Sequence, residues 1–418
     1  MFRKAYIKFN YLKKKYYFSD LHNVSAHYLF ELCLDRNYKL KKNFKIFFFH
    51  LLLILVTIAS IIIAKIRGIN KINYFIAYQS ATDPRSIWAL KELNLKKYIH
   101  VVRVNSLAVA LKVLFKYKIV IFHQSISYFS HFFIPNKYST LKKKYNMFYK
   151  FSLYKLSIYE KIFKFLKIKK FVSIDDYREL QIFLYICKKY NIFSIGYMHS
   201  WFCQYRVALQ YNYFDRYIVW SDYFAKQLIL LNNNYKNRII LKNFKQQKFR
   251  KNKFNLNNKE NSIIFFSDMC LDFEEVKTYL DYIINYTKFK LYVKIKVNED
   301  VKLNFLKYLN SKNIKIFKNE SLKELFLKVN PSIFIATNSS VLLESTIYNC
   351  LPFMIKTKND FSEQFYKDKI VIKITSVQQL ETGFKLLPNK DQVIKKIRNK
   401  IWIKQSNAYL NYNSKIFI

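Results

Sequence analysis

The stretch SLKELFLKVNPSIFIATNSSVLLESTIYNCLPFMI, residues 321–355, decides the fold of this chain. It runs in the order helix, apolar strand, Thr-Asn-Ser-Ser loop, helix, apolar strand, which is the repeating unit of a parallel α/β sheet. Ser321 and Glu324 have the spacing of a capping box at the start of the first helix. The first strand ends at Ala336, and ligands of open α/β sheets bind at the carboxyl ends of strands. The loop after Ala336 is therefore the first place to look for a site.

This loop offers a set of polar groups that suits an anion. Thr337, Asn338, Ser339 and Ser340 carry hydroxyl and amide groups, and the amides at the start of the next helix are hydrogen-bond donors. Glu344 follows within two helical turns and can accept hydrogen bonds from ribose hydroxyls. The alternative is a capped helix without a ligand, because Ser and Asn are common N-cap residues.

The same alternation of short apolar runs and amphipathic stretches extends in both directions. Strands are predicted at 72–78, 98–104, 117–124, 171–176, 191–200, 217–220, 262–269, 289–297, 314–318, 331–336 and 351–356. A basic, aromatic connection separates the third and fourth of these strands. Residues 242–262 are polar, basic and without periodicity, which is typical of a linker. We therefore expect a basic, hydrophobic segment at 1–70, Rossmann-like domains at 71–250 and 251–385, and a C-terminal helix at 386–418 that packs back on the first domain.

Charge is the most unusual feature of the composition. The formal charge is +46, from 73 basic and 27 acidic residues, which favours anionic partners such as nucleic acid, anionic lipid or phosphorylated substrates. An A+T-rich coding sequence would give the same bias as a solvated lysine coat. The five cysteines are widely spaced and form no C-x-x-C pair, so neither a disulfide framework nor a structural zinc site is indicated.

The order of elements in 321–355 resembles the donor-nucleotide site of glycosyltransferases with the GT-B fold. The resemblance covers about residues 260–385. It implies two Rossmann-like lobes, a small-residue loop that holds the donor phosphates, and a Glu on the ribose, which here are Ser339, Ser340 and Glu344. Many members have Gly before the Pro of the following turn, whereas this chain has Asn349-Cys350-Leu351-Pro352.

A second motif covers 171–202 and is similar to bacterial surface-polysaccharide glycosyltransferases of that fold. One strand ends in an acidic pair, Asp175 and Asp176, and the next ends in Gly-x-x-His with His199. The resemblance implies that one carboxylate or His199 deprotonates the acceptor hydroxyl. Adjacent side chains on a strand point to opposite faces, so only one Asp can reach a cleft. The structural alternatives are an N-cap and a hydrogen-bonded histidine, and Asp83 is a further candidate base.

Three more residues are donor-site candidates. Lys294 and Lys296 lie on one face of a predicted strand and can neutralise phosphates, in the segment where bacterial sialyltransferases carry a His-Pro pair that this chain lacks. Asp268 ends another strand and either lines the same cleft or caps a helix. No Asp-x-Asp, H-x-x-x-H or Walker A pattern is present, so we expect neither a metal nor a cofactor.

Residues 46–64, IFFFHLLLILVTIASIIIA, are long enough to cross a bilayer. More basic residues precede this segment than follow it, so the positive-inside rule would export the rest of the chain, away from nucleotide-sugar donors. The segment can instead lie in the inner leaflet, span against the charge bias, or be a buried core helix. These alternatives stay open.

The resemblance implies a metal-independent glycosyltransferase at the cytoplasmic side of the bacterial inner membrane. Its partners would be a nucleotide-sugar donor, a capsule or lipooligosaccharide acceptor and the membrane surface. The enzymatic alternative transfers a phosphate-bearing unit, such as glycerol phosphate. A basic nucleic-acid-binding protein and a structural membrane protein are alternatives from other classes, although no nucleic-acid-binding motif is present.

Overall fold

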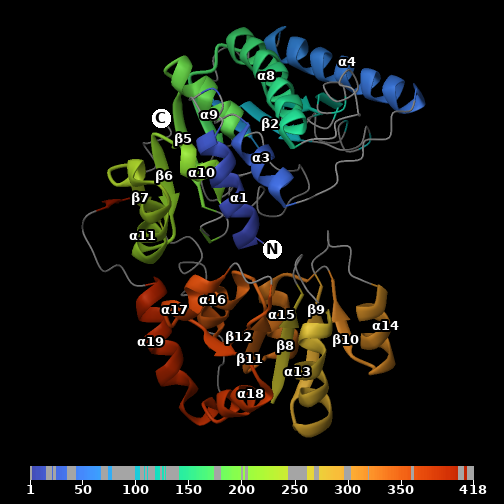
Figure 1. Ribbon diagram of the computed structural model, residues 1–418, viewed down its shortest axis with the longest axis vertical. Coiled ribbons are helices and arrows are strands. Elements are labelled where there is room, and N and C mark those ends of the chain that lie inside the picture. The colour runs from blue at the N-terminus through green and yellow to red at the C-terminus, as the bar shows by residue number, and fades with distance from the viewer. Residues whose placement is uncertain are drawn as a thin grey trace. The chain divides into compact units, whose positions relative to one another are not determined.

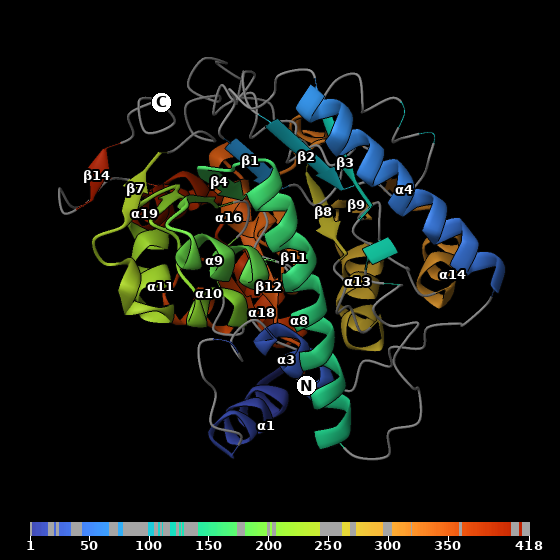
Figure 2. The same cartoon turned by 90° about the horizontal axis from the view of Figure 1, so that it is seen from above.

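The computed structural model describes residues 2–15, 21, 25–34, 44–66, 74–77, 99–103, 108, 111, 118–122, 125–126, 128, 141–173, 180–198, 201–202, 206–242, 261–267, 273–295, 303–318, 320–358, 362–402 and 409–411 (Figures 1 and 2). The chain forms two compact units. The N-terminal unit comprises Arg3–Val219, Ala225–Lys242 and Asn407–Ile418, and the C-terminal unit comprises Met1–Phe2, Trp220–Phe224 and Asn243–Ser406. The main boundary, after Lys242, coincides with the start of the predicted linker.

The N-terminal unit is built on a parallel sheet of eight strands in the order β14-β7-β6-β5-β4-β1-β2-β3. The strands are β1 (Tyr74–Ala77), β2 (Ile99–Arg103), β3 (Lys118–Ile121), β4 (Lys170–Ser173), β5 (Phe193–Tyr197), β6 (Arg216–Val219), β7 (Ile239–Leu241) and β14 (Leu410–Asn411). Val172, Ile195 and Ile218 in its middle strands are fully buried. Strands covered on both faces are expected to be apolar along their length, which is the pattern seen in the sequence.

Helices pack around this sheet. They are α1 (Phe2–Lys15), α3 (Ala26–Cys33), α4 (Phe44–Ile66), α8 (Leu141–Phe165), α9 (Leu180–Lys189), α10 (Val207–Tyr211), α11 (Asp222–Leu231) and the 3-10 helix η2 (Asn233–Tyr235). The apolar segment at 46–64 is thus the body of one helix, α4, which packs on β3.

The basic, aromatic connection of the sequence contains a helix of 25 residues, α8. Its buried side chains recur every three or four positions on one face: Tyr145, Phe148, Phe151, Ser152, Lys155, Leu156, Tyr159 and Phe163. Such spacing is that of an amphipathic helix. The many lysines of this segment obscured the period, because they keep the segment as a whole from being apolar, although one of them, Lys155, is buried.

The C-terminal unit has a parallel sheet of six strands in the order β10-β9-β8-β11-β12-β13. The strands are β8 (Ser262–Phe266), β9 (Lys290–Lys294), β10 (Lys315–Phe317), β11 (Ile333–Ala336), β12 (Leu351–Ile355) and β13 (Ile372–Ile374). Its helices are α13 (Phe273–Tyr286), α14 (Leu303–Ser311), α15 (Leu322–Val329), α16 (Val341–Ser345), α17 (Glu363–Lys367), α18 (Val377–Phe384) and α19 (Lys390–Trp402), with 3-10 helices η3 (Thr346–Tyr348) and η4 (Leu387–Asn389).

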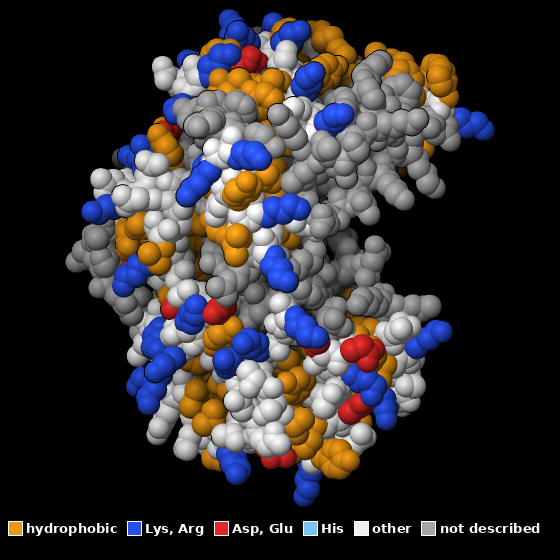
Figure 3. Space-filling model, in the orientation of Figure 1, with side chains coloured by type: hydrophobic (Ala, Val, Ile, Leu, Met, Phe, Trp, Pro, Cys, Tyr) orange, Lys and Arg blue, Asp and Glu red, His pale blue; other side chains and the backbone are white. Residues whose placement is uncertain are grey.

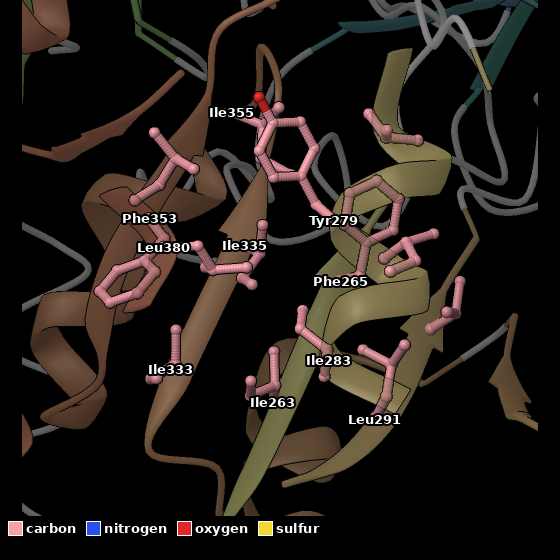
Figure 4. Packing of buried hydrophobic residues seen from close by; sticks show 14 of the residues in the cluster. Ile263, Phe265, Tyr279, Ile283, Leu291, Ile333, Ile335, Phe353, Ile355 and Leu380 are labelled. Carbon is pink, nitrogen blue, oxygen red and sulfur yellow. The ribbon is translucent and has the colours of Figure 1, made fainter. Parts of the chain in front are cut away.

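One face of this sheet forms a continuous core (Figure 4). Alternate strand residues share a face, so Ile263 and Phe265 of β8 lie beside Ile333 and Ile335 of β11. Side chains of α13 and α18, including Ile283 and Leu380, cover them. The buried cluster continues through β9 and β12 and fixes the strands of the unit in one register.

The two sheets have the same topology. Numbered by their order along the chain, six strands of each sheet lie side by side, from one edge, in the order third, second, first, fourth, fifth and sixth. That is the Rossmann order, in which the chain reverses its direction of progress between the first and fourth strands. The reversal lies between β1 and β4 in the N-terminal unit and between β8 and β11 in the C-terminal unit. The predicted fold, two Rossmann-like units preceded by an apolar helix, is confirmed.

The C-terminal end of the chain contains a helix and a short strand. Ile394 of α19 belongs to the buried core of the C-terminal unit, and packing of this helix on the N-terminal domain stays a prediction. The segment that joins the other sheet is strand β14, which pairs with β7. The amphipathic period predicted the helix, whereas a two-residue strand carries too little sequence signal to be predicted.

Candidate functional site

The carboxyl ends of β8 and β11 mark the place where a ligand of the C-terminal unit is expected. These strands flank the reversal and are paired along their length, with Ala336 opposite Phe266. Ser267 follows β8 directly, and Thr337 follows β11. Loops on either side of a reversal leave a crevice between them. The Thr-Asn-Ser-Ser loop therefore stands at the position that topology selects for binding.

The local sequence fixes how the chain enters this loop. The predicted capping box of α15 is confirmed: Glu324 N donates to Ser321 Oγ at 3.3 Å, and Ser321 N donates to Glu324 Oε2 at 2.6 Å. Asn330 ends the helix in the left-handed conformation, with φ 44°. Pro331 and Ser332 then lead into β11, whose four residues are fully buried. A capped helix and a buried strand hold the loop on rigid supports.

The four loop residues fall into two pairs. Thr337 and Asn338 are 1% and 5% exposed and are held within the unit, whereas Ser339 and Ser340 are partly exposed. Ser339 Oγ accepts a hydrogen bond from Val341 N at 3.3 Å. Of the predicted loop ligands, only the two serines can present hydroxyls to a bound molecule.

The amides at the start of α16 contribute less than we predicted. Leu342 N donates to Ser339 O at 3.3 Å, Leu343 N to Ser340 O at 3.0 Å and Glu344 N to Ser340 O at 3.4 Å. The first turn is wound tightly, as in a 3-10 helix, so these donors already have partners. A ligand at this loop would be bound by side-chain hydroxyls and neighbouring charges more than by the amides of α16.

Glu344 lies on the same face of α16 as Ser340. The bond from Glu344 N to Ser340 O shows an i to i+4 relation, and residues four apart on a helix are neighbours. Both side chains are partly exposed. Burial, followed by the charge of Glu344, raises the pKa of Tyr348 one turn further on. The Ser340 hydroxyl and the Glu344 carboxylate therefore belong to one face of this helix, and their role at a donor site stays a prediction.

The turn after η3 begins with a residue in a conformation that glycine usually adopts. Asn349 has φ 59° and ψ 38°, a left-handed conformation that Asn tolerates better than other non-glycine residues. Its Nδ2 donates to Asp391 Oδ1 of α19 at 2.8 Å. Trp402 Nε1, also from α19, donates to Thr346 Oγ1 at 3.0 Å. Helix α19 therefore fixes the far end of α16 and η3.

Lys294 is engaged elsewhere in the unit. Its Nζ donates to the carbonyl of Lys318 after β10 at 2.6 Å. Burial lowers the pKa of Lys294, and the charges of Glu320 and Glu324 act in the opposite direction. Strand β9 is separated from β11 by β8. Lys294 is therefore partly buried and bound within the unit, and its role at the donor phosphates stays a prediction.

Two residues that we did not single out from the sequence follow β12. Lys356 is exposed and Thr357 is buried, and β12 pairs with β11 along its length. Within the part of the chain that the structure describes, the Thr357 hydroxyl is buried without a hydrogen-bond partner, which is uncommon for such a group. The sequence signal that could have identified these two residues is a Lys-Thr-Lys run directly after an apolar strand. In the sheet, that strand is the neighbour of the strand that leads into the serine loop.

Six predicted site residues lie outside the described residues: His199, Asp175, Asp176, Asp83, Asp268 and Lys296. The strands that precede them are described. Strand β4 ends two residues before Asp175, and β1 ends six residues before Asp83. These two strands flank the reversal of the N-terminal sheet, and β5, which precedes His199, lies next to β4. The candidate bases of the sequence thus follow neighbouring strands.

No cluster of three or more His, Cys, Asp and Glu side chains occurs among the described residues. A cavity of about 350 Å³ is present in the N-terminal unit, lined by Ser194, Asp215, Arg238 and their neighbours. Asp215 Oδ2 accepts from Ser194 N and from Ser194 Oγ, both at 2.8 Å, and Arg238 pairs with Asp215 at 3.6 Å. This cavity lies where β5 and β6 begin, at the sheet edge opposite the strand ends that carry the candidate residues.

Solved structures provide the comparison with known proteins. The glycotransferase of kitacinnamycin is 12% identical over 78% of this chain and 94% of its own, with a TM-score of 0.49. UDP-GlcNAc 2-epimerase from Neisseria meningitidis, bound to UDP-GlcNAc, is 11% identical over 82% and 96%, with a TM-score of 0.48. MurG of Acinetobacter baumannii is 11% identical over 80% and 96%, with a TM-score of 0.46. No family model and no curated protein matches the sequence.

These likenesses are weak and concern the fold. The expected GT-B type of architecture follows from the chain itself, because each of its two units has a parallel sheet of Rossmann order. Both sheets also place polar residues after the strands that flank their reversals. These polar residues, and not the likenesses, decide which ligand can bind there.

Proposed function

We propose that this chain is a glycosyltransferase that uses a nucleotide-sugar donor and a glycan acceptor. The observation that supports it best is that Ser340 and Glu344 share one face at the start of α16. This helix comes shortly after β11, a strand that flanks the reversal. Hydroxyls suit phosphate oxygens, and a carboxylate suits ribose hydroxyls. One short helix thus offers partners for both parts of a nucleotide diphosphate.

In this proposal the donor phosphates bind to the hydroxyls of Ser339 and Ser340, with the exposed ammonium of Lys356 as a counter-charge. Positive groups placed at the phosphates stabilise the negative charge that grows on the leaving nucleotide. The chain has no Asp-x-Asp pattern after a predicted strand, which supports neutralisation by side chains without a metal.

The acceptor step is proposed for the residues that follow β1, β4 and β5. The acceptor oxygen forms a bond to the anomeric carbon while the bond from that carbon to the phosphate oxygen breaks, and the nucleotide leaves with both bonding electrons. One of Asp176, Asp175, Asp83 and His199 takes the acceptor proton. The resemblance of 171–202 to surface-polysaccharide enzymes supports a capsule or lipooligosaccharide acceptor.

Calorimetry on a serine pair tests the donor site. Replacing both Ser339 and Ser340 by Ala should weaken donor binding at least about tenfold, because a hydrogen bond to a charged group contributes about 1.5–3 kcal/mol. UDP, CMP and GDP are titrated separately, so the nucleotide is identified in the same experiment. Ser311→Ala is the matched control, since Ser311 is exposed in the same unit and its hydroxyl donates to Tyr308 O of its own helix.

Unchanged donor affinity in the double variant, with an unchanged unfolding temperature, would contradict the phosphate-site assignment. Salt-sensitive binding of any oligonucleotide, with no preference for one nucleotide family, would support the nucleic-acid-binding alternative. Incubation with a panel of nucleotide sugars, followed by detection of slow hydrolysis, then identifies the donor.

A further inference from the structure

Helix α4 has two different faces. Its inner face consists of Leu53, Thr57, Ser60, Ile61 and Ala64, all of which are buried and recur at helical spacing. The outer face is apolar and exposed: Phe44, Phe48, Phe49, Leu52, Leu55, Ile58, Ile62, Ile63 and Ile66. Figure 3 shows hydrophobic side chains gathered where this helix lies. An exposed apolar stripe of this length marks a contact surface.

The inner face is bound to the body of the N-terminal unit by specific polar contacts. Phe122 N, just past β3, donates to Thr57 Oγ1 at 3.2 Å. His50 Nδ1 lies 2.8 Å from Ser125 Oγ, and the His50 ring stacks on Tyr128 with 4.3 Å between centroids. A free membrane helix would contact lipid on all its faces, whereas the inner face of α4 contacts protein. Helix α4 is therefore an integral part of the unit.

The same contacts are incompatible with α4 as a free membrane-spanning helix. Among the described strands, β3 is the outermost of its sheet, and α4 packs on it. If α4 crossed a bilayer while keeping its contacts, the sheet edge would enter the hydrocarbon layer, where unpaired backbone groups are not tolerated. A helix with one face on protein and one apolar face outward fits the membrane interface instead.

Charge selects anionic lipid as the occupant of the outer face. Lys45 lies on the outer face in the first turn of the helix, beside Phe48 and Phe49, and Lys65 lies in the last turn. The part of the outer face between them carries no charge, and the sequence on either side of the helix continues with basic residues. A second copy of the chain would bring another formal charge of +46 toward the first, which disfavours self-association. Juxtamembrane basic residues are attracted to anionic headgroups.

We infer that α4 lies in the plane of an anionic bilayer surface, with its outer face in the headgroup and acyl boundary and its inner face on β3. The chain on both sides of α4 then stays on one side of the membrane. This arrangement removes the topological conflict of the sequence, because the α/β units need not be exported. The inference does not depend on the proposed transferase activity.

Vesicle flotation of the full chain tests the surface. Phosphatidylcholine vesicles with and without phosphatidylglycerol are compared at fixed salt. Leu55→Lys with Ile62→Lys should lower the partition onto anionic vesicles at least about tenfold, because two apolar residues of the membrane-facing surface become charged. Leu230→Lys with Leu327→Lys is the matched control, since these residues are 79% and 59% exposed on other helices. The control should bind as the unchanged chain does.

Equal vesicle binding by both double variants, with equal unfolding temperatures, would overturn the inference. So would a self-associated form in solution that Leu55→Lys with Ile62→Lys dissociates while vesicle binding is absent, because the outer face would then be a protein interface.

Protease accessibility separates a helix in the plane from a helix that spans. The full chain carries a peptide tag at each terminus and is bound to sealed membranes. Added protease should remove both tags if α4 lies in the plane. Protection of one tag until detergent is added would show that α4 spans and would overturn the inference. Failure of the donor-binding experiment would leave either result unaffected.

Discussion

The two α/β units share a strand order but differ in the residue types that come after the strands at their reversals. In the C-terminal unit the residues after β8, β11 and β12 are Ser267, the Thr-Asn-Ser-Ser loop and Lys356. In the N-terminal unit the chain runs from β1 toward Asp83 and from β4 directly to Asp175 and Asp176. By position in the chain, the edge of the C-terminal unit combines hydroxyls and a lysine with one carboxylate, Asp268, whereas the edge of the N-terminal unit carries three, Asp83, Asp175 and Asp176.

This difference indicates how one topology can take two roles. The order of strands decides where a ligand binds. The residue types after the strands decide which chemistry that place supports, since hydroxyls and lysines suit phosphates while a carboxylate or imidazole accepts a proton. We therefore propose that the C-terminal unit binds the donor and that the N-terminal unit carries out proton transfer, and each half can be tested separately.

The largest expected effect is on the carboxylate side. Asp176→Asn should lower the transfer rate by about 10²–10⁴-fold, as loss of a general base does, while the donor affinity stays unchanged. His199→Ala tests the alternative base in the same assay. Transfer rates are measured at saturating donor, with calorimetry of the donor alone beside them. Loss of donor affinity in the Asp176 variant would contradict the assignment of donor binding to the C-terminal unit. Wild-type transfer rates in both variants would show that neither residue is the general base.

A matched pair of glycine substitutions tests whether the units are separate bodies. A Cβ on Gly196 of β5 would overlap the Tyr217 ring and lie 2.8 Å from Phe214, and a Cβ on Gly383 of α18 would lie 2.8 Å from the Phe353 ring. Either change to Ala should destabilise its own unit by about 1–3 kcal/mol, the range for overpacking a core. Scanning calorimetry should show one transition lowered in each variant, and donor affinity should fall only for Gly383→Ala. A shift of both transitions by either variant would contradict separate units.

Lys356 provides a further test of whether the donor binds to the C-terminal unit. Lys356→Ala should weaken donor binding about tenfold, because an ammonium near a phosphate contributes on the order of 1–2 kcal/mol when partly exposed. The effect should decrease as salt is raised. Lys385→Ala, an exposed lysine after α18, serves as the control. Equal affinities for the two variants would remove Lys356 from the site.

The smallest effect is expected at Asn349, the left-handed residue of the turn after η3. Asn349→Ala should destabilise the C-terminal unit by about 1–2 kcal/mol, because Ala at φ 59° is strained and the bond to Asp391 is lost. Asn349→Gly keeps the conformation and should cost less. Urea unfolding of the two variants gives the difference, and a larger loss for Gly than for Ala would show that the left-handed backbone is not what selects Asn.

Most of the fold could be predicted because buried parallel strands leave long apolar runs. Those runs located β1 to β6 and β8 to β12 to within a few residues, and Ser321 with Glu324 located the start of α15. The short strands β7, β13 and β14 were not predicted, whereas β10, also of three residues, stood out by its alternating sequence IKIFK. The strand order itself came from the structure, since a periodic pattern does not specify which strands are neighbours.

The site could be predicted only in outline. The position of the serine loop followed from its place after an apolar strand, but its division into buried Thr337 and Asn338 and accessible Ser339 and Ser340 depends on how α16 winds. Lys294 was selected because it lies on a strand, and its hydrogen bond to the Lys318 carbonyl could not be predicted from the sequence. Such contacts depend on side-chain geometry that sequence spacing does not carry.

The way α4 sits on β3 has a practical consequence for handling this protein. Removing residues 1–66 is the usual step to obtain a soluble form of a protein with an apolar N-terminal helix. Here that step would uncover the outermost strand of an eight-stranded sheet and leave Phe122 N without its threonine partner. An uncovered strand edge recruits other chains. Shortened forms should therefore precipitate more readily than the full chain, and mild detergent that shields the outer face of α4 is the better route to purification.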